Sequence, residues 1–214
     1  AVGEGGPELV KQLLGKTYDV ARPEVVLVWL ENAPRPGVGP QDIAIALIGA
    51  VFKNGFVKNR VMEFAGPGVA GLSVEYRCGI DVMTTETTCW SSIWQTDAVT
   101  EEYFRIHGRP EAYKELRPAD VAYYDGCIEL DLSTVECMIA LPMHPSYAYP
   151  IRELKANAKD ILHEVETRAN EQLGGKVRMD LVSKVQPDGR IYVEQGVVAG
   201  CSGGTYENIC AVAD

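Results

Sequence analysis

The sequence lacks several features that would assign a function at once. Its six cysteines include no CxxC pair, so it carries no self-contained zinc or iron–sulfur motif. Lysine and arginine form no basic run and the formal net charge is −10, which argues against a nucleic-acid partner. The longest apolar stretches, such as 25–30 and 43–52, are far shorter than the ~20 residues needed to cross a bilayer. No membrane partner is therefore expected.

Targeting and disulfide signals are also missing. The opening residues, Ala-Val-Gly-Glu-Gly-Gly-Pro, contain no basic region followed by an apolar one, so no signal peptide is expected. They contain no Met either, which suggests a processed or excised chain. The cysteines are sparser than in the disulfide frameworks of small secreted domains, so we expect free thiols and a cytoplasmic location. A chain of 214 residues, 46% of them hydrophobic, is long enough for one large domain or two smaller ones.

The hydrophobic pattern predicts strands that alternate with helices. Short runs rich in β-branched residues predict strands at 24–31, 60–64, 127–132, 177–185 and 191–198. Helical periodicity and capping residues predict helices at 7–14, after Pro40, from Ser73 to about 87, from Asp97 to 108, and at 157–173. Alternating strands and helices are typical of an α/β fold with a mostly parallel sheet. The turn near Asp188 suggests that this sheet is mixed.

A domain boundary is predicted in the middle of the chain. Residues 108–122 contain Pro110 and Pro118 and show no clear apolar period. We therefore expect one unit at 1–109, a linker at 110–117, and a second unit at 118–214.

The sharpest chemical feature is the run Gly-Cys-Ser-Gly-Gly at 200–204, predicted to lie between a strand and a helix. Glycines allow a ligand to come close, and a helix N-terminus favours the thiolate that binds iron or attacks an electrophile. From the local sequence, Cys201 could be a metal ligand, a nucleophile or a small buried residue of the turn. A nucleophilic cysteine needs a histidine partner. The three histidines, His107, His144 and His163, are weak candidates, and His144 is the best of them.

Glu86 is the second candidate. It is a lone carboxylate followed by an uncharged stretch that reaches Thr96. Such a carboxylate is either a solvated surface group or a group buried for a purpose, and the local sequence leaves both open.

Several motifs, in order along the chain, resemble those of the aconitase superfamily. They lie at 63–69 (Glu-Phe-Ala-Gly-Pro-Gly-Val), 83–86 (Met-x-x-Glu), 124–125 (Tyr-Asp), 129–133 (Glu-Leu-Asp-Leu-Ser) and 200–208. Other positions depart from the family pattern: Val82, Thr88-Cys89, Trp94-Gln95 and Ser202-Gly203. The chain therefore resembles a divergent hydratase branch of the family.

The resemblance implies a fold and two site residues. The fold would be a three-layer α/β/α arrangement of the aconitase iron–sulfur domain type, with 1–109 similar to the second domain and 118–214 to the first half of the third. Cys201 would be the first of three cysteines that hold a 4Fe–4S cluster. Glu86 would be an active-site glutamate near the water bound to that cluster. The implied reaction is the dehydration and rehydration of a hydroxy di- or tricarboxylate.

The resemblance also implies that part of the site is missing. The other two cluster cysteines would lie outside this chain, and one cysteine cannot hold a cubane cluster. We therefore expect a fragment that has neither cluster nor turnover alone and is completed by the remaining aconitase segments, in cis or as a separate subunit. Two alternatives stay open: a non-catalytic aconitase-fold module for binding or regulation, and an enzyme that uses Cys201 as a nucleophile.

Overall fold

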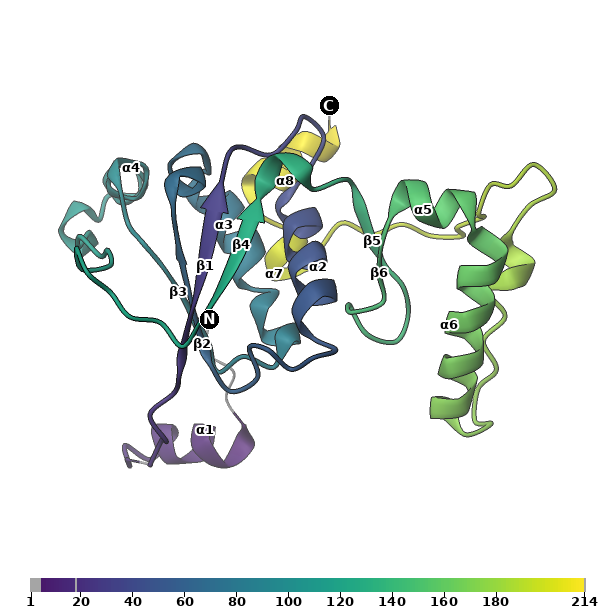
Figure 1. The fold of residues 1–214 in the computed structure, drawn as a ribbon, viewed down its shortest axis with the longest axis horizontal. Coiled ribbons are helices and arrows are strands. Elements are labelled where there is room, and N and C mark those ends of the chain that lie inside the picture. Colours follow the sequence, from purple (N-terminus) through teal and green to yellow (C-terminus); the bar gives the residue numbers. More distant parts are fainter. Residues whose placement is uncertain (1–4, 18, 214) are drawn as a thin grey trace.

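The fold is built on a parallel sheet of four strands. A computed structural model of the chain describes residues 5–17 and 19–213. The strands are β1 (Val25–Glu31), β2 (Val61–Ala65), β3 (Ser91–Trp94) and β4 (Gly126–Asp131), in the order β3-β2-β1-β4 (Figure 1). All three strand pairs are parallel. The expected α/β class with a mostly parallel sheet is confirmed, and β1, β2 and β4 lie where the sequence predicted strands.

Eight helices occur in the described residues. They are α1 (Gly6–Leu13), α2 (Pro40–Val51), α3 (Val74–Asp81), α4 (Ala98–Ile106), α5 (Ile151–Ala156), α6 (Ala158–Leu173), α7 (Gly200–Gly203) and α8 (Tyr206–Ala213). The predicted caps are confirmed: Ser73 Oγ accepts the Tyr76 N–H at 3.0 Å, and Asp97 Oδ1 accepts the Thr100 N–H at 3.1 Å.

One helix is shorter than the sequence predicted. α3 ends at Asp81, and a separate 3₁₀ turn, η2 (Thr84–Thr87), follows it. Threonine side chains explain the break, because the Thr84 hydroxyl donates to the Asp81 carbonyl at 2.7 Å and the Thr87 hydroxyl donates to the Thr84 carbonyl at 2.6 Å. Such side-chain bonds compete with helix propagation.

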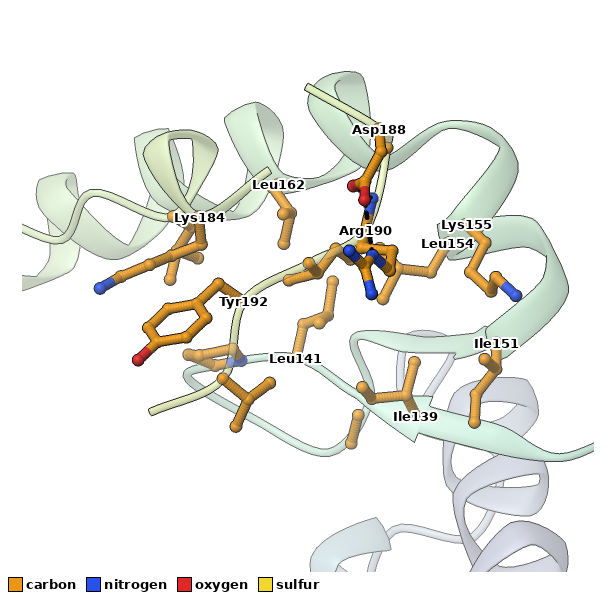
Figure 2. Close-up of a pocket in the computed structure, with 16 residues that line it drawn as sticks. Ile139, Leu141, Ile151, Leu154, Lys155, Leu162, Lys184, Asp188, Arg190 and Tyr192 are labelled. Carbon is orange, nitrogen blue, oxygen red and sulfur yellow. Dashed lines mark hydrogen bonds and ion pairs between the residues drawn. The ribbon is translucent and has the colours of Figure 1, made fainter. Parts of the chain in front are cut away.

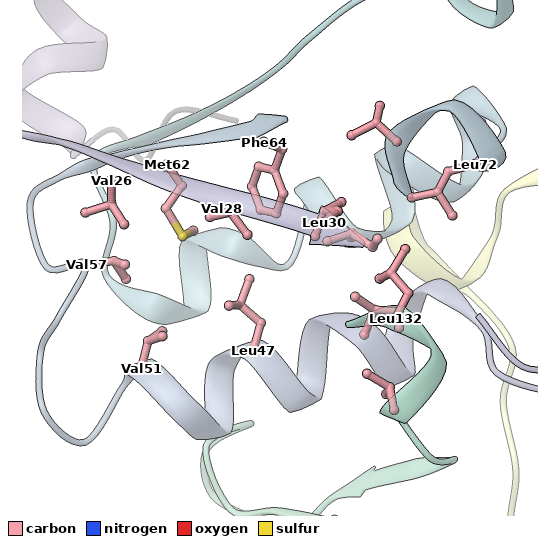
Figure 3. Packing of buried hydrophobic residues seen from close by; sticks show 14 of the residues in the cluster. Val26, Val28, Leu30, Leu47, Val51, Val57, Met62, Phe64, Leu72 and Leu132 are labelled. Carbon is pink, nitrogen blue, oxygen red and sulfur yellow. The ribbon is translucent and has the colours of Figure 1, made fainter. Parts of the chain in front are cut away.

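The main core lies on one face of the sheet. Alternate residues of β1 point into it, namely Val26, Val28 and Leu30. The side chains of Leu47 and Val51 on α2 meet this face, beside Met62 and Phe64 of β2 (Figure 3). Fully burying each of these side chains contributes about 1.5–3 kcal/mol. The opposite face is more open, since Trp29 is 37% and Ile93 is 40% exposed.

A second, smaller cluster forms after β4. The short antiparallel strands β5 (Met138–Ala140) and β6 (Ala148–Pro150) lead into α5 and α6. Three residues of α6, Ile161, Leu162 and Val165, pack with Leu141 and Leu154. The four-residue period predicted for 157–173 is thus confirmed, and Gly174 ends the helix in the left-handed conformation, φ 57°. In Figure 1 the β5–β6 hairpin lies between the four-stranded sheet and α6.

The predicted strands at 177–185 and 191–198 were wrong. In the described residues this region holds no strand. It contains a 3₁₀ turn at Val182–Lys184, a single bridge between Val185 and Ile191, and between them a turn in which the Gly189 N–H donates to the Gln186 carbonyl at 2.9 Å. Side chains of α6 form hydrogen bonds with backbone groups that, in a strand, would bond to a neighbouring strand. Glu166 accepts the N–H groups of Leu181 and Val182 at 2.7 and 3.1 Å, and Asn170 accepts the N–H of Met179 at 2.7 Å. Sequence alternation does not reveal these contacts.

The division of the chain at 110–117 stays a prediction. The strand that follows this segment, β4, pairs along its whole length with β1 of the first unit. The sheet therefore continues across residues 110–117. Within the part of the chain that the structure describes, no helix has the length and apolar character to cross a membrane.

A buried ion pair joins α3 to the start of α4. The Arg77 side chain is 5% and the Asp97 side chain 23% exposed, and Arg77 Nη2 lies 2.7 Å from Asp97 Oδ2. Burial raises the pKa of Asp97, but hydrogen bonds from Arg77 and Thr100 outweigh it and hold that pKa below its usual value.

Acid is expected to weaken the fold through Asp97. A depressed carboxyl pKa stabilises the folded state at pH values above the usual aspartate range, and this contribution is lost as the pH falls through the folded pKa. Urea unfolding from about pH 5 to about pH 2 should show a falling free energy of unfolding. Asp97→Asn should flatten that decline more than Glu101→Gln, at the next carboxyl of α4, does. An equal pH slope in Asp97→Asn and wild type would contradict this assignment.

Candidate functional site

Cys201 lies in the short helix α7, on a turn that is fixed from three sides. Gln41 Nε2 donates to the Ser202 carbonyl at 2.6 Å, and Asn208 Nδ2 donates to the same oxygen at 2.8 Å. The Ser202 hydroxyl donates to the Gly79 carbonyl at 3.0 Å. Gly200 adopts φ 84°, a conformation that favours glycine. The strand predicted before this turn is absent from the described residues, but the predicted helix after it is present as α8.

The first turn of α8 is held by α3. The N–H of Glu207 donates to Glu75 Oε2 at 2.7 Å, and the Ser73 hydroxyl donates to Glu207 Oε2 at 2.5 Å. Ser73 therefore caps α3 and holds α8 at the same time. Because α7 is anchored on α2 and α3, and α8 on α3, the exposed Cys201 thiol lies on a turn whose backbone is fixed.

Glu86 lies elsewhere, in η2. Its side chain is 47% exposed, and its Oε2 atom lies 4.0 Å from His144 Nε2. The His144 ring stacks on Phe52 at 4.0 Å, and its Nδ1 atom accepts the Ser146 N–H at 3.1 Å. The surface position that the sequence left open for Glu86 is thus the observed one.

The structure does not bring Glu86 and Cys201 together. The Cys201 turn contacts Gln41 in the first turn of α2, whereas Glu86 lies beside His144, which stacks on Phe52 just after the last turn. At about 1.5 Å per residue, α2 separates Gln41 from Phe52 by about 16 Å. The two candidates therefore lie near opposite ends of α2.

The histidines do not support Cys201 as a nucleophile. In residues 5–17 and 19–213, none of them is hydrogen-bonded or ion-paired to Cys201. His107 Nδ1 lies 2.7 Å from the Tyr103 carbonyl, His144 faces Glu86, and His163 is exposed on α6. Nothing in the described site therefore supplies the base that a nucleophilic cysteine needs.

Side chains that could bind a metal are scattered over the described residues. No group of three or more His, Cys, Asp or Glu side chains in the described residues is placed to hold a metal ion. All six cysteines are free, and Cys201 is exposed on its glycine-rich turn. This arrangement fits a single thiolate ligand of a cluster whose other ligands come from elsewhere.

Two further motif residues have structural tasks. Asp125 Oδ2 accepts the N–H of Val25, at 2.8 Å, which ties the start of β4 to β1. The Tyr124 hydroxyl donates to Glu63 Oε1 at 3.1 Å, and burial, together with the Glu63 charge, raises the pKa of Tyr124 to about 12. The sequence pattern singled out this Tyr-Asp pair but did not show that it clamps the sheet.

A large apolar pocket lies away from the Cys201 turn. Its volume is about 880 Å³, and its walls come from β5, α5, α6 and residues 181–193. Leu141, Leu154 and Leu162 line it, and so does Arg190, whose exposed side chain is paired with Asp188 (Figure 2). These contacts give it the character of an extension of the second core cluster.

Comparison with known proteins identifies the family. The model of the aconitase family (aconitate hydratase) matches residues 1–214. Aconitate hydratase A of Thermus thermophilus is 32% identical over 72% of this chain and 18% of its own length. The 2-methylcitrate dehydratase (2-methyl-trans-aconitate forming) of Shewanella oneidensis is 31% identical, over 78% of this chain and 20% of its own length.

A third relative extends the range of names. Phosphinomethylmalate isomerase of Streptomyces viridochromogenes is 30% identical over 87% of this chain and 21% of its own length. The chain thus spans about a fifth of the length of the curated relatives that it matches. The match over all 214 residues shows that the chain belongs to the aconitase family.

Proposed function

We propose that this chain is the part of an iron–sulfur hydro-lyase that carries one cluster cysteine. The parent protein would remove water from a small hydroxy di- or tricarboxylate and add it back. The observation that carries the proposal is the exposed Cys201 thiol on a turn braced by α2 and α3, within a chain that matches the aconitase family throughout. The names of its relatives, a hydratase and a dehydratase among them, support the same reaction class.

Cys201 would hold the cluster, and its neighbours would hold Cys201. Gln41 and Asn208 fix the Ser202 carbonyl, so the backbone of the turn cannot swing away from α2. When bound, the cluster would supply an iron that acts as a Lewis acid on the substrate oxygens. The free thiols support a reducing compartment such as the cytoplasm.

Glu86 would hold or move the proton of the departing water. Its carboxylate lies near His144, which can exchange a proton with it through solvent. In this chain η2 and α7 lie near opposite ends of α2. For Glu86 to act beside the cluster, the intact protein must bring η2 closer to α7 than the chain alone does.

The cluster would need donors beyond this chain. A single cysteine supplies one of the ligands that a cubane requires. We therefore propose that the chain alone has no cluster and no turnover, and that other aconitase segments complete the site, in cis or as a separate subunit.

The test uses the full-length parent, reconstituted anaerobically with iron and sulfide. Cys201→Ser should abolish the broad visible absorption of the cluster and lower the hydration rate by more than about 100-fold, since even outer-shell changes at metal sites cost 10–100-fold. Cys127→Ser, at an exposed cysteine on β4, is the matched control and should keep both properties. A Cys201→Ser protein with the wild-type spectrum would refute the cluster assignment.

A further inference from the structure

A second pocket has a charge opposite to that of the chain as a whole. It has a volume of about 480 Å³ and lies between the loop after β1, the segment before β5, and α5. Its charged residues are Arg35, Arg152, Lys155 and Glu136. Three cationic side chains and one carboxylate thus line it, in a chain whose formal net charge is −10.

The cations come from separate segments and are held in different ways. Arg35 Nη2 donates to the carbonyls of Thr134 and Val135 at 3.1 and 2.9 Å, which fixes the guanidinium. These bonds use only Nη2, and a guanidinium has five N–H donors. Lys155 lies one turn after Ile151 on the same face of α5, and both line the pocket. No carboxylate of the described residues forms an ion pair with Lys155.

The carboxylate of Glu136 is bound by a cationic side chain of this pocket. Arg152 donates to both oxygens of its carboxylate, Nε to Oε2 at 3.1 Å and Nη2 to Oε1 at 3.0 Å. Hydrogen bonding to Arg152, with smaller contributions from the charges of Arg152 and Arg35, holds the pKa of Glu136 below its usual value. One internal carboxylate leaves part of the positive charge uncompensated.

We infer that the pocket bounded by Arg35, Arg152 and Lys155 binds a small polyanion that carries carboxylate or phosphate groups. The pocket is within the size range of small-molecule sites, about 300–1,000 Å³. Arg35 presents fixed donors, Lys155 supplies a mobile charge, and Arg152 becomes available when the ligand displaces Glu136. A polyanion can engage several of these cations at once, whereas a monoanion engages fewer of them. The inference does not depend on the proposed hydro-lyase activity or on Cys201.

Calorimetric titration of the chain with two probes, inorganic phosphate and propane-1,2,3-tricarboxylate, tests the site at low ionic strength, with acetate as the monoanion control. Both polyanions, or one of them, should bind saturably and more tightly than acetate, and added salt should weaken the binding because the charges are exposed. The tighter of the two probes identifies the ligand class, and either result supports the site.

Three variants make the test specific. Lys155→Gln should weaken polyanion binding about five- to tenfold, because it removes one charge within a few ångströms of the ligand. Glu136→Gln should tighten binding about fivefold, because it removes the competing carboxylate and releases Arg152. Lys159→Gln, at an exposed lysine of α6 outside the pocket, should bind as wild type does.

Three outcomes would overturn the inference. They are the absence of saturable binding, an equal loss in Lys155→Gln and Lys159→Gln, and no gain in Glu136→Gln. Because Lys155 and Glu136 are polar side chains at the pocket surface, both variants are expected to fold. Circular dichroism of each variant checks this before the titration.

Discussion

Gly66→Ala is expected to lower the free energy of unfolding by about 2–6 kcal/mol. Gly66 adopts φ 112° and ψ 170°, a region that is essentially restricted to glycine. A Cβ atom at this position would lie 2.6 Å from the Leu30 carbonyl oxygen and 2.9 Å from the Leu30 nitrogen. β1 cannot move away, because β2 and β4 pair with it on both sides.

The size of the effect follows from two costs that add. Backbone strain at such a position costs about 1–3 kcal/mol, and overpacking against a fixed neighbour costs about 1–3 kcal/mol more. A domain of this kind has a total stability of about 5–15 kcal/mol. Thermal unfolding followed by circular dichroism should show a melting temperature lowered by roughly 5–20 °C.

Gly71→Ala is the matched control for Gly66→Ala. Gly71 ends the 3₁₀ turn that follows Gly66, η1 (Pro67–Gly71), and a Cβ atom there would meet no atom within 4 Å. Its melting temperature should stay within a few degrees of wild type. If the melting temperature of Gly66→Ala also stayed within a few degrees of wild type, the close approach of this turn to β1 would be disproved.

Arg77→Met is expected to lower the free energy of unfolding by about 3 kcal/mol or more. The Arg77 side chain is 5% exposed, and its three nitrogens contact the carbonyls of Leu72 and Val69, the Asp97 carboxylate and the Thr100 hydroxyl. Methionine fills a similar volume but leaves these acceptors without a donor. The partly buried Asp97 carboxylate would then lack its counter-charge, which is costly in a poorly solvated site.

Arg105→Met separates this effect from the loss of any arginine. Arg105 also pairs with a carboxylate, that of Glu102, but both side chains are more than half exposed, at 65% and 54%. An exposed pair of this kind contributes about 0–1 kcal/mol. Urea titration should therefore show a large shift of the midpoint for Arg77→Met and a small one for Arg105→Met. Equal midpoint shifts in the two variants would mean that the Arg77 network does not stabilise the fold more than an exposed ion pair does.

The sequence predicted the elements whose signals are local. β1 and β2 are short apolar runs, α6 repeats an apolar residue every four positions, and Ser73 and Asp97 are caps. β3 was not predicted, because four residues, Ser-Ser-Ile-Trp, are too short a run to stand out. The strand predicted at 177–185 failed because Glu166 and Asn170 of α6 occupy backbone groups in this segment.

In the candidate site, too, only the features with a local signal in the sequence were predictable. The glycines around Cys201 are visible in the sequence, and so is the helix that follows. The hydrogen bond from Gln41 that fixes the turn joins residues 161 positions apart, so no local pattern could reveal it. Residue spacing likewise could not show that η2 and α7 lie near opposite ends of α2.

The pairing of β1 with β4 also determines when the sheet can be completed during synthesis. Val25 and Asp125, which join the starts of these strands, are 100 residues apart. At about 5–20 residues per second, the ribosome makes that stretch in roughly 5–20 s. Until β4 emerges, one edge of β1 has unpaired backbone groups next to buried valines, the type of surface that aggregates. Nascent chains stalled between β3 and β4 should therefore be the species most dependent on chaperones.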